Sequence, residues 1–132
     1  MSTSPTFAST PKCVYSRNTA ACTARDGSDT DVALAMTGAA AGTIVERLIF
    51  HYEVTTTAGM LMIFLSTDGG TTKRIIDEIP VSAITPSGTV KAFHVEWPAP
   101  KGFVLPDTNA KLYWGTYNAE ACVCHAFGAD LT

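Results

Sequence analysis

The sequence has few charged residues, and those present do not favour the positive sign. Charged residues make up 16% of the chain, with nine Lys and Arg against twelve Asp and Glu and a net charge of -3. A nucleic-acid-binding domain needs an excess of positive charge to neutralise phosphates, so this composition excludes a basic nucleic-acid binder. Hydrophobic residues make up 46%, which excludes the composition of a disordered chain. The 132 residues match one domain, large enough to fold without a disulfide or metal.

Long apolar runs and helical periodicity are also missing. The longest apolar run, 60–65, is far shorter than the ~20 residues of a membrane-spanning helix. The first residues, MSTSPTFASTPK, show neither a basic nor an apolar signal region, so we expect no secretory signal and folding in a reducing cytosol. The best helix candidate, 32–41, is Ala-rich but lacks an amphipathic stripe. We therefore expect at most a turn or two of helix.

What is present is a series of short apolar strands separated by turn residues. The predicted strands are 13–17, 31–36, 43–54, 60–66, 72–79, 89–97, 110–117 and 121–127. Strands at this spacing are typical of sandwiches and small barrels. We predict an all-β, eight-stranded antiparallel β-sandwich, jelly-roll-like, formed by residues 13–132. Residues 1–12 are too polar for a core strand, and we expect an extended N-terminal arm there.

The predicted strand 60–66 is apolar on both faces. Alternation places Met60, Met62 and Phe64 on one side, opposite a second apolar set. A strand of this kind is either covered by another segment or buried in an oligomer interface. We assign Met60, Met62 and Phe64 to a subunit interface.

The histidines are the first candidates for chemistry. His51 and Glu53 share one strand face, as do His94 and Glu96, and a carboxylate can orient an imidazole for general-base catalysis. No nucleophile or oxyanion feature accompanies either pair, so we expect polar pairs on the solvent side of a sheet. His125 alternates with apolar neighbours, and we expect it to be partly buried by packing. These residues predict no enzymatic activity.

Other reactive or aromatic side chains give equally weak signals. The four cysteines lack zinc-site spacing and are expected to be free thiols: Cys13, Cys22, Cys122 and Cys124. Three aspartates crowd one loop without a calcium-binding pattern: Asp26, Asp29 and Asp31. Four aromatic residues suggest a sugar-stacking platform, although strand aromatics are more often core: Trp97, Trp114, Tyr113 and Tyr117. We expect no metal and no cofactor.

Several segments together resemble a known family. They are PTFASTP (5–11), TTTAGM (55–60) leading into an apolar strand, VSAITPSGTV (81–90), YNAE (117–120) and AFG (126–128). In these segments the chain resembles small proteins encoded beside the major capsid protein in tailed bacteriophages, identified as capsid decoration or cement proteins. The resemblance covers nearly the whole chain, but it lies in turns and strands and does not explain the four cysteines.

The resemblance implies a structural virion protein. Such a protein is a β-sandwich or jelly roll, a homo-oligomer and commonly a trimer, that binds the major capsid protein on the outer surface of the capsid and stabilises it. It contacts neither nucleic acid nor membrane. We assign the capsid contact to the N-terminal arm, at Pro5, Thr6, Phe7 and Pro11, because an arm can order on binding.

Two other classes of function stay open. A carbohydrate- or receptor-binding module of the phage tail would need Trp97 and Trp114 exposed and coplanar on one surface. An enzyme would need His51 or His94 to meet a partner from another strand in a pocket.

Overall fold

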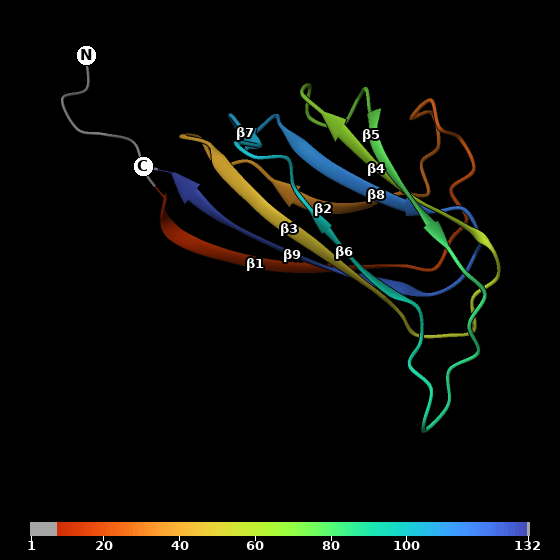
Figure 1. The fold of residues 1–132 in the computed structure, drawn as a ribbon. Coiled ribbons are helices and arrows are strands. Elements are labelled where there is room, and N and C mark those ends of the chain that lie inside the picture. The colour runs from red at the N-terminus through yellow and green to blue at the C-terminus, as the bar shows by residue number, and fades with distance from the viewer. Residues whose placement is uncertain (1–7, 132) are drawn as a thin grey trace, which may run out of the picture.

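The computed structural model describes residues 8–131, and these contain strands but no helix. The prediction of an all-β sandwich is confirmed, with two antiparallel layers that face one another (Figure 1). The strands are β1 (Ala8–Asn18), β2 (Ala33–Thr37), β3 (Thr43–Tyr52), β4 (Gly59–Ser66), β5 (Arg74–Val81), β6 (His94–Pro98), β7 (Val104–Leu105), β8 (Lys111–Thr116) and β9 (Cys122–Leu131). The eight predicted strands are all present, and β7 is a short addition.

The chain doubles back on itself to build the two layers. The five-stranded sheet has the order β1-β9-β3-β6, with β7 also paired to β3, and the four-stranded sheet has the order β2-β8-β4-β5. The antiparallel pairs are nested along the chain: β1 with β9, β2 with β8, β3 with β6, and β4 with β5. Successive nested pairs alternate between the sheets, so segments distant in the sequence lie side by side.

The core lies between the sheets and includes polar links from one layer to the other. The Tyr52 hydroxyl on β3 lies 2.6 Å from Thr116 Oγ1 on β8. Trp97 on β6 donates its Nε1–H to Asp77 on β5 at 2.7 Å. Because a buried polar group is costly without a partner, these bonds allow large amphipathic side chains to fill the core.

A β-bulge in β3 corrects the predicted alternation of that strand. The sequence predicts that even-numbered residues face the core, with Glu46 as the exception. Val45 is buried before the bulge and Leu48 after it, because the pairing with β9 shifts between Val45 and Arg47. The extra residue, Glu46, has no partner on β9, as in other bulges, and its side chain is exposed. Gly128 faces this site, where an added Cβ would lie 2.2 Å from the Ile44 carbonyl oxygen.

Several strand limits differ from the predicted ones. Residues 8–12, expected in the arm, belong to β1 and pair with the end of β9. Pro11 lies in this pairing, which is possible because β1 is an edge strand and proline lacks a donor. Pro80, expected to end a strand, lies within β5, the edge of the other sheet. The Ala-rich segment proposed as a helix candidate contains β2.

Candidate interaction surfaces

The outer face of the four-stranded sheet is covered by the connection between β1 and β2, residues 19–32, here called the strap. The Cys22 N–H donates to the Thr116 carbonyl at 2.8 Å, and Arg25 forms an ion pair with Glu78 on β5. Gly115 on β8 makes close approach possible, because an added Cβ would lie 2.7 Å from Cys22 Cβ. The strap is therefore attached to both the middle and the edge of this sheet.

The strap overturns the predicted subunit interface. Met62 and Phe64 are 0% exposed and form a cluster with Cys22. Met60 is half-buried and packs against the same cluster. Side chains already enclosed within one chain have no surface to offer a second copy, so the assignment of Met62 and Phe64 to an interface is wrong. The other explanation of a strand that is apolar on both faces was a covering segment, and for β4 that segment is the strap.

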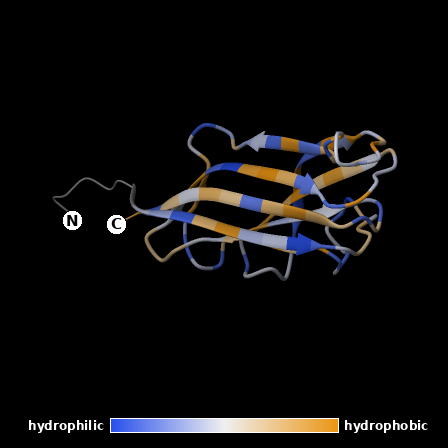
Figure 2. Ribbon diagram, turned by 90° about the horizontal axis from the view of Figure 1, so that it is seen from below, coloured by the Kyte–Doolittle hydropathy of each residue, from blue (hydrophilic) through white to orange (hydrophobic). Residues whose placement is uncertain are grey.

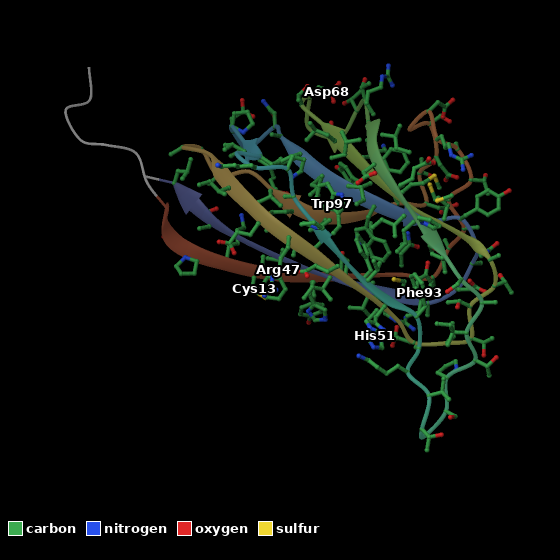
Figure 3. The ribbon with its side chains drawn as sticks, in the orientation of Figure 1. Cys13, Arg47, His51, Asp68, Phe93 and Trp97 are labelled. Carbon is green, nitrogen blue, oxygen red and sulfur yellow. The ribbon has the colours of Figure 1, made fainter. Side chains whose placement is uncertain are left out.

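The outer face of the five-stranded sheet carries all three histidines of the chain. We call this surface, formed by the outward side chains of β1, β9, β3 and β6, the histidine face. Its other prominent members are Cys13, Tyr15, Arg17, Arg47, Ile49, Glu96, Val123 and Phe127. Cys13, Arg47 and His51 lie together on the lower side of the sandwich in Figure 3. The view from below in Figure 2 shows hydrophobic and hydrophilic bands alternating along the strands.

Each of the three imidazoles on this face lies beside another ring. His51 and His94 are directly opposite one another on β3 and β6, and their rings stack with centroids 5.8 Å apart and planes at 22°. His51 donates from Nδ1 to the Tyr52 carbonyl at 2.8 Å. His125 lies 6.1 Å from the ring of Tyr15, which is 78% exposed. The expectation that His125 is partly buried is wrong, because it lies in the outward register of β9 and is exposed.

The expected pairs of histidine with glutamate are replaced by pairs of arginine with glutamate. Arg17 lies 2.6 Å from Glu53, and Arg47 lies 3.1 Å from Glu96. Glu53 is held by Arg17 of β1, across β9, and Glu96 is held by Arg47 of the neighbouring strand β3. Neither carboxylate is bonded to an imidazole in these pairs. His51 and His94 meet each other on an exposed surface, so they do not meet a catalytic partner in a pocket.

The two tryptophans do not form a sugar-stacking platform. Trp97 is 5% exposed and Trp114 is 0% exposed. Trp97 lies between the layers in Figure 3, and Trp114 donates its Nε1–H to Ser16 on β1 at 2.8 Å. Of the other two aromatics, Tyr113 packs beside the strap cluster and Tyr117 is 43% exposed. Because both indole rings are enclosed, they are core residues, as strand aromatics more often are, and the alternative of a sugar-stacking platform is contradicted.

Three of the segments that carry the family resemblance, 55–60, 81–90 and 117–120, meet at one end of the sandwich, here called the loop end (residues 53–58, 82–93 and 117–121). Thr56 donates its hydroxyl to the Ser82 carbonyl at 2.8 Å. Thr57 N–H donates to the Glu120 carboxylate at 2.9 Å, and Asn118 donates to the Thr57 hydroxyl at 3.0 Å. These bonds brace the three loops, and the longest of them projects downward from the sandwich in Figure 1.

The predicted capsid-contact residues are only partly within the described chain. Pro5, Thr6 and Phe7 lie outside the described residues. Pro11 is exposed on β1, opposite Ala129 on β9. Beside it, a groove separates β1 from β2 and is lined by Lys12, Val14, Tyr15 and residues 34–37. Leu34 in this groove is 42% exposed.

The acidic loop of the strap uses its carboxylates to shape the backbone. Asp26 accepts bonds from the Ser28 N–H and hydroxyl, and these bonds lower the pKa of Asp26. Asp29 accepts from Thr23 and Asp31 N–H groups. Within residues 8–131, no three His, Cys, Asp or Glu side chains gather in a way that could hold a metal ion.

The cysteines are free in the structure. Cys13 is exposed, and the other three are buried: Cys22, Cys122 and Cys124. Burial raises the pKa of the Cys22 thiol to about 11 and that of Cys122 to about 12. It also raises the pKa of Cys124. Since thiolates are the reactive form, the buried thiols are inert packing residues.

Comparison with known proteins finds no family model that matches the chain and no curated protein with a significantly similar sequence. No helix in the described part of the chain is long and apolar enough to cross a membrane.

Proposed function

We propose that this protein is a structural virion protein that binds the outer surface of a phage capsid and stabilises it as a decoration protein. The observation that carries the proposal is the free edge of β1. This long strand pairs only with β9, and the groove beside it is bordered by β2. An edge strand next to an apolar groove can accept an extended segment of another protein by strand addition. We propose the major capsid protein as that partner, because the resemblance implies it.

The groove supplies both parts of such a contact. The unpaired backbone edge of β1 offers donors and acceptors, while Val14 and Leu34 offer apolar surface. Lys12 donates to the Thr37 carbonyl at 2.9 Å and joins the two strands across the groove. The predicted contact at Pro11 lies on the same strand, so we propose that Pro11 and the groove belong to one capsid-binding region.

The nested strand pairing supports the proposal that the sandwich is a jelly roll. In a jelly roll, a folded-back ribbon of eight strands is wound so that successive pairs enter alternate sheets. The four nested pairs of this chain alternate in that way. Jelly rolls are common in viral capsid domains, which agrees with a virion protein.

Co-sedimentation with expanded, empty phage heads tests the function. We expect wild-type protein to sediment with the heads, and Leu34→Glu and a deletion of residues 2–7 to reduce the bound fraction. Val90→Glu is the matched control, since Val90 is a 48% exposed aliphatic residue on the loop end. Absence of wild-type protein from the pellet would overturn the proposal. Cryo-electron microscopy of the virion would then place the chain on capsid or tail.

A receptor-binding module is the second candidate, and the loop end favours it. Three loops braced by side-chain hydrogen bonds form a pre-organised surface, and Val90 and Tyr117 are exposed there. Density for the chain at the tail tip, together with unchanged binding of Leu34→Glu to heads, would favour this function over capsid decoration.

A further inference from the structure

We infer that the histidine face is the contact surface between copies of this chain, and that protonation of its histidines opens the contact. The inference concerns the free protein and stands whether or not the protein binds a capsid. It starts from the difference between the two outer faces. The strap covers the four-stranded sheet, whereas the histidine face exposes Tyr15, and Ile49, Val123 and Phe127 are only half-buried.

The charge pattern of the histidine face fits a second copy of itself. Its two arginines and two glutamates are joined in the pairs Arg17–Glu53 and Arg47–Glu96. These four charges cancel, and Glu46 at the bulge leaves one further carboxylate on each copy, so two such faces approach with little repulsion when the imidazoles are neutral. A strongly basic or acidic partner would find no opposite field there. The face therefore suits an identical neutral face better than a charged surface.

The size of the face fits a weak, concentration-dependent contact. Four strands about 4.8 Å apart, over a length of ~7 residues at ~3.3 Å each, give a plan area of about 450 Å² per copy. Two copies thus contribute about 900 Å² before side-chain relief is counted, which is below the ~1,200–2,000 Å² of stable interfaces and in the range of weak, transient ones. Flat sheets pack face to face through alternating side chains in this way, with Tyr15 as the large exposed anchor.

The histidines make such a contact sensitive to pH. Histidine is the side chain that changes charge between pH 5 and 8, and His51 and His94 are stacked directly opposite one another. The other titratable or charged groups that border the histidines are Cys13, Tyr15 and Arg17 on β1, Glu46, Arg47 and Glu53 on or beside β3, and Glu96 on β6. Arg17 already holds Glu53, and Arg47 already holds Glu96. Protonation of the histidines would therefore place several positive charges in the contact, and there are too few free carboxylates to neutralise each imidazolium.

Light scattering of the purified protein across a concentration series at pH 7.5 and pH 5.5 tests the inference. We expect an assembly of at least two 14.0 kDa chains at pH 7.5. An imidazole that must stay neutral in the contact weakens association about tenfold per pH unit below its pKa. We therefore expect the dissociation constant to rise at least about tenfold at pH 5.5. A monomer at pH 7.5, or an assembly unchanged at pH 5.5, would overturn the inference.

Matched variants locate the contact. Tyr15→Asp should dissociate the assembly at pH 7.5, whereas Tyr117→Asp, the same change at an exposed tyrosine of the loop end, should not. The double variant His51→Gln with His94→Gln should remain associated at pH 5.5. Circular dichroism confirms folding of each variant. Equal effects of the two tyrosine variants, or a double variant that dissociates at pH 5.5 like wild type, would contradict the proposal.

The thiol of Cys13 gives an independent readout of the same face. It is the exposed cysteine of the four and lies in the histidine face. Its rate of maleimide labelling should fall as the wild-type concentration rises through the assembly range. In Tyr15→Asp the rate should not depend on concentration. A wild-type rate independent of concentration, in a range where light scattering shows assembly, would place the contact elsewhere.

Discussion

Truncation of Met62 to alanine should destabilise the fold without changing the number of copies. Met62 is 0% exposed in the cluster beneath the strap. Replacement of a buried Met by Ala typically costs about 2–5 kcal/mol, through lost transfer free energy and the cavity left behind. The strap is a loop that can partly close on the cavity, so we expect a loss near ~2–3 kcal/mol. The half-buried Met60→Ala, on the same face of β4, is the matched control and should cost about 1 kcal/mol.

Urea unfolding followed by tryptophan fluorescence measures this loss, because Trp97 and Trp114 are both buried and become exposed on unfolding. Light scattering of the same samples measures the copy number. A variant Met62→Ala that loses less than about 1 kcal/mol of stability but changes its molar mass would refute the account of β4, since a core side chain carries a larger cost. The double variant with Cys22→Ala should show a coupling energy of about 0.5–3 kcal/mol, because contacting residues are not additive.

Three further predictions concern the bulge, the sheet corner and the thiols. Gly128→Ala should lower the unfolding free energy by more than about 2 kcal/mol, because the added Cβ would meet the Ile44 carbonyl oxygen, whereas Gly88→Ala, with open space around it, should be nearly neutral in urea unfolding. The Thr43 hydroxyl, helped by Lys12, holds the pKa of Asp130 below its ordinary value of 3.8. A carboxyl whose pKa is lowered by folding stabilises the folded protein at pH values above its unfolded-state pKa, and this stabilisation is lost as the pH falls through the folded-state pKa. In thermal unfolding, Asp130→Asn should therefore be less stable than wild type at pH 7 and equally stable once the carboxyl is protonated. A stability difference that is the same at all pH values would contradict this. One thiol, Cys13, should react with a thiol reagent in the native protein and all four after unfolding, and fast native reaction of more than one thiol would contradict the burial of the rest.

The sequence predicts the class of fold because strand alternation and turns are local signals. All eight predicted strands appear, although the one expected over 89–97 is shorter and spans His94–Pro98 because 89–93 belong to a loop, and the even positions of β3 after Glu46 face the core as expected. The strand order could not be predicted, since it depends on pairings such as β1 with β9 that join opposite ends of the chain. The extension of β1 to Ala8 has the same cause, because polar residues at an edge gain order from pairing with β9.

The candidate surfaces were harder to predict than the strands. The apolar character of both faces of β4 was visible, but the segment that covers one face is mostly polar and contributes few apolar contacts, chiefly Cys22 and Val32. Composition alone therefore gave no sign that the strap lies on Met62 and Phe64. The burial of Trp97 and Trp114 depends on partners in the opposite sheet, Asp77 and Ser16, which no local pattern identifies.

The bulge at Glu46 connects the core of the sandwich to the histidine face. Side chains alternate along a strand, so one extra residue exchanges the two faces of everything that follows it. After the bulge, Leu48 and Phe50 point inward and Arg47, Ile49 and His51 point outward. The same shift that lets β3 fill the core thus brings His51 opposite His94 and beside Val123. The histidine face is therefore tied to the packing of the core, and a change of register in β3 would remove both together.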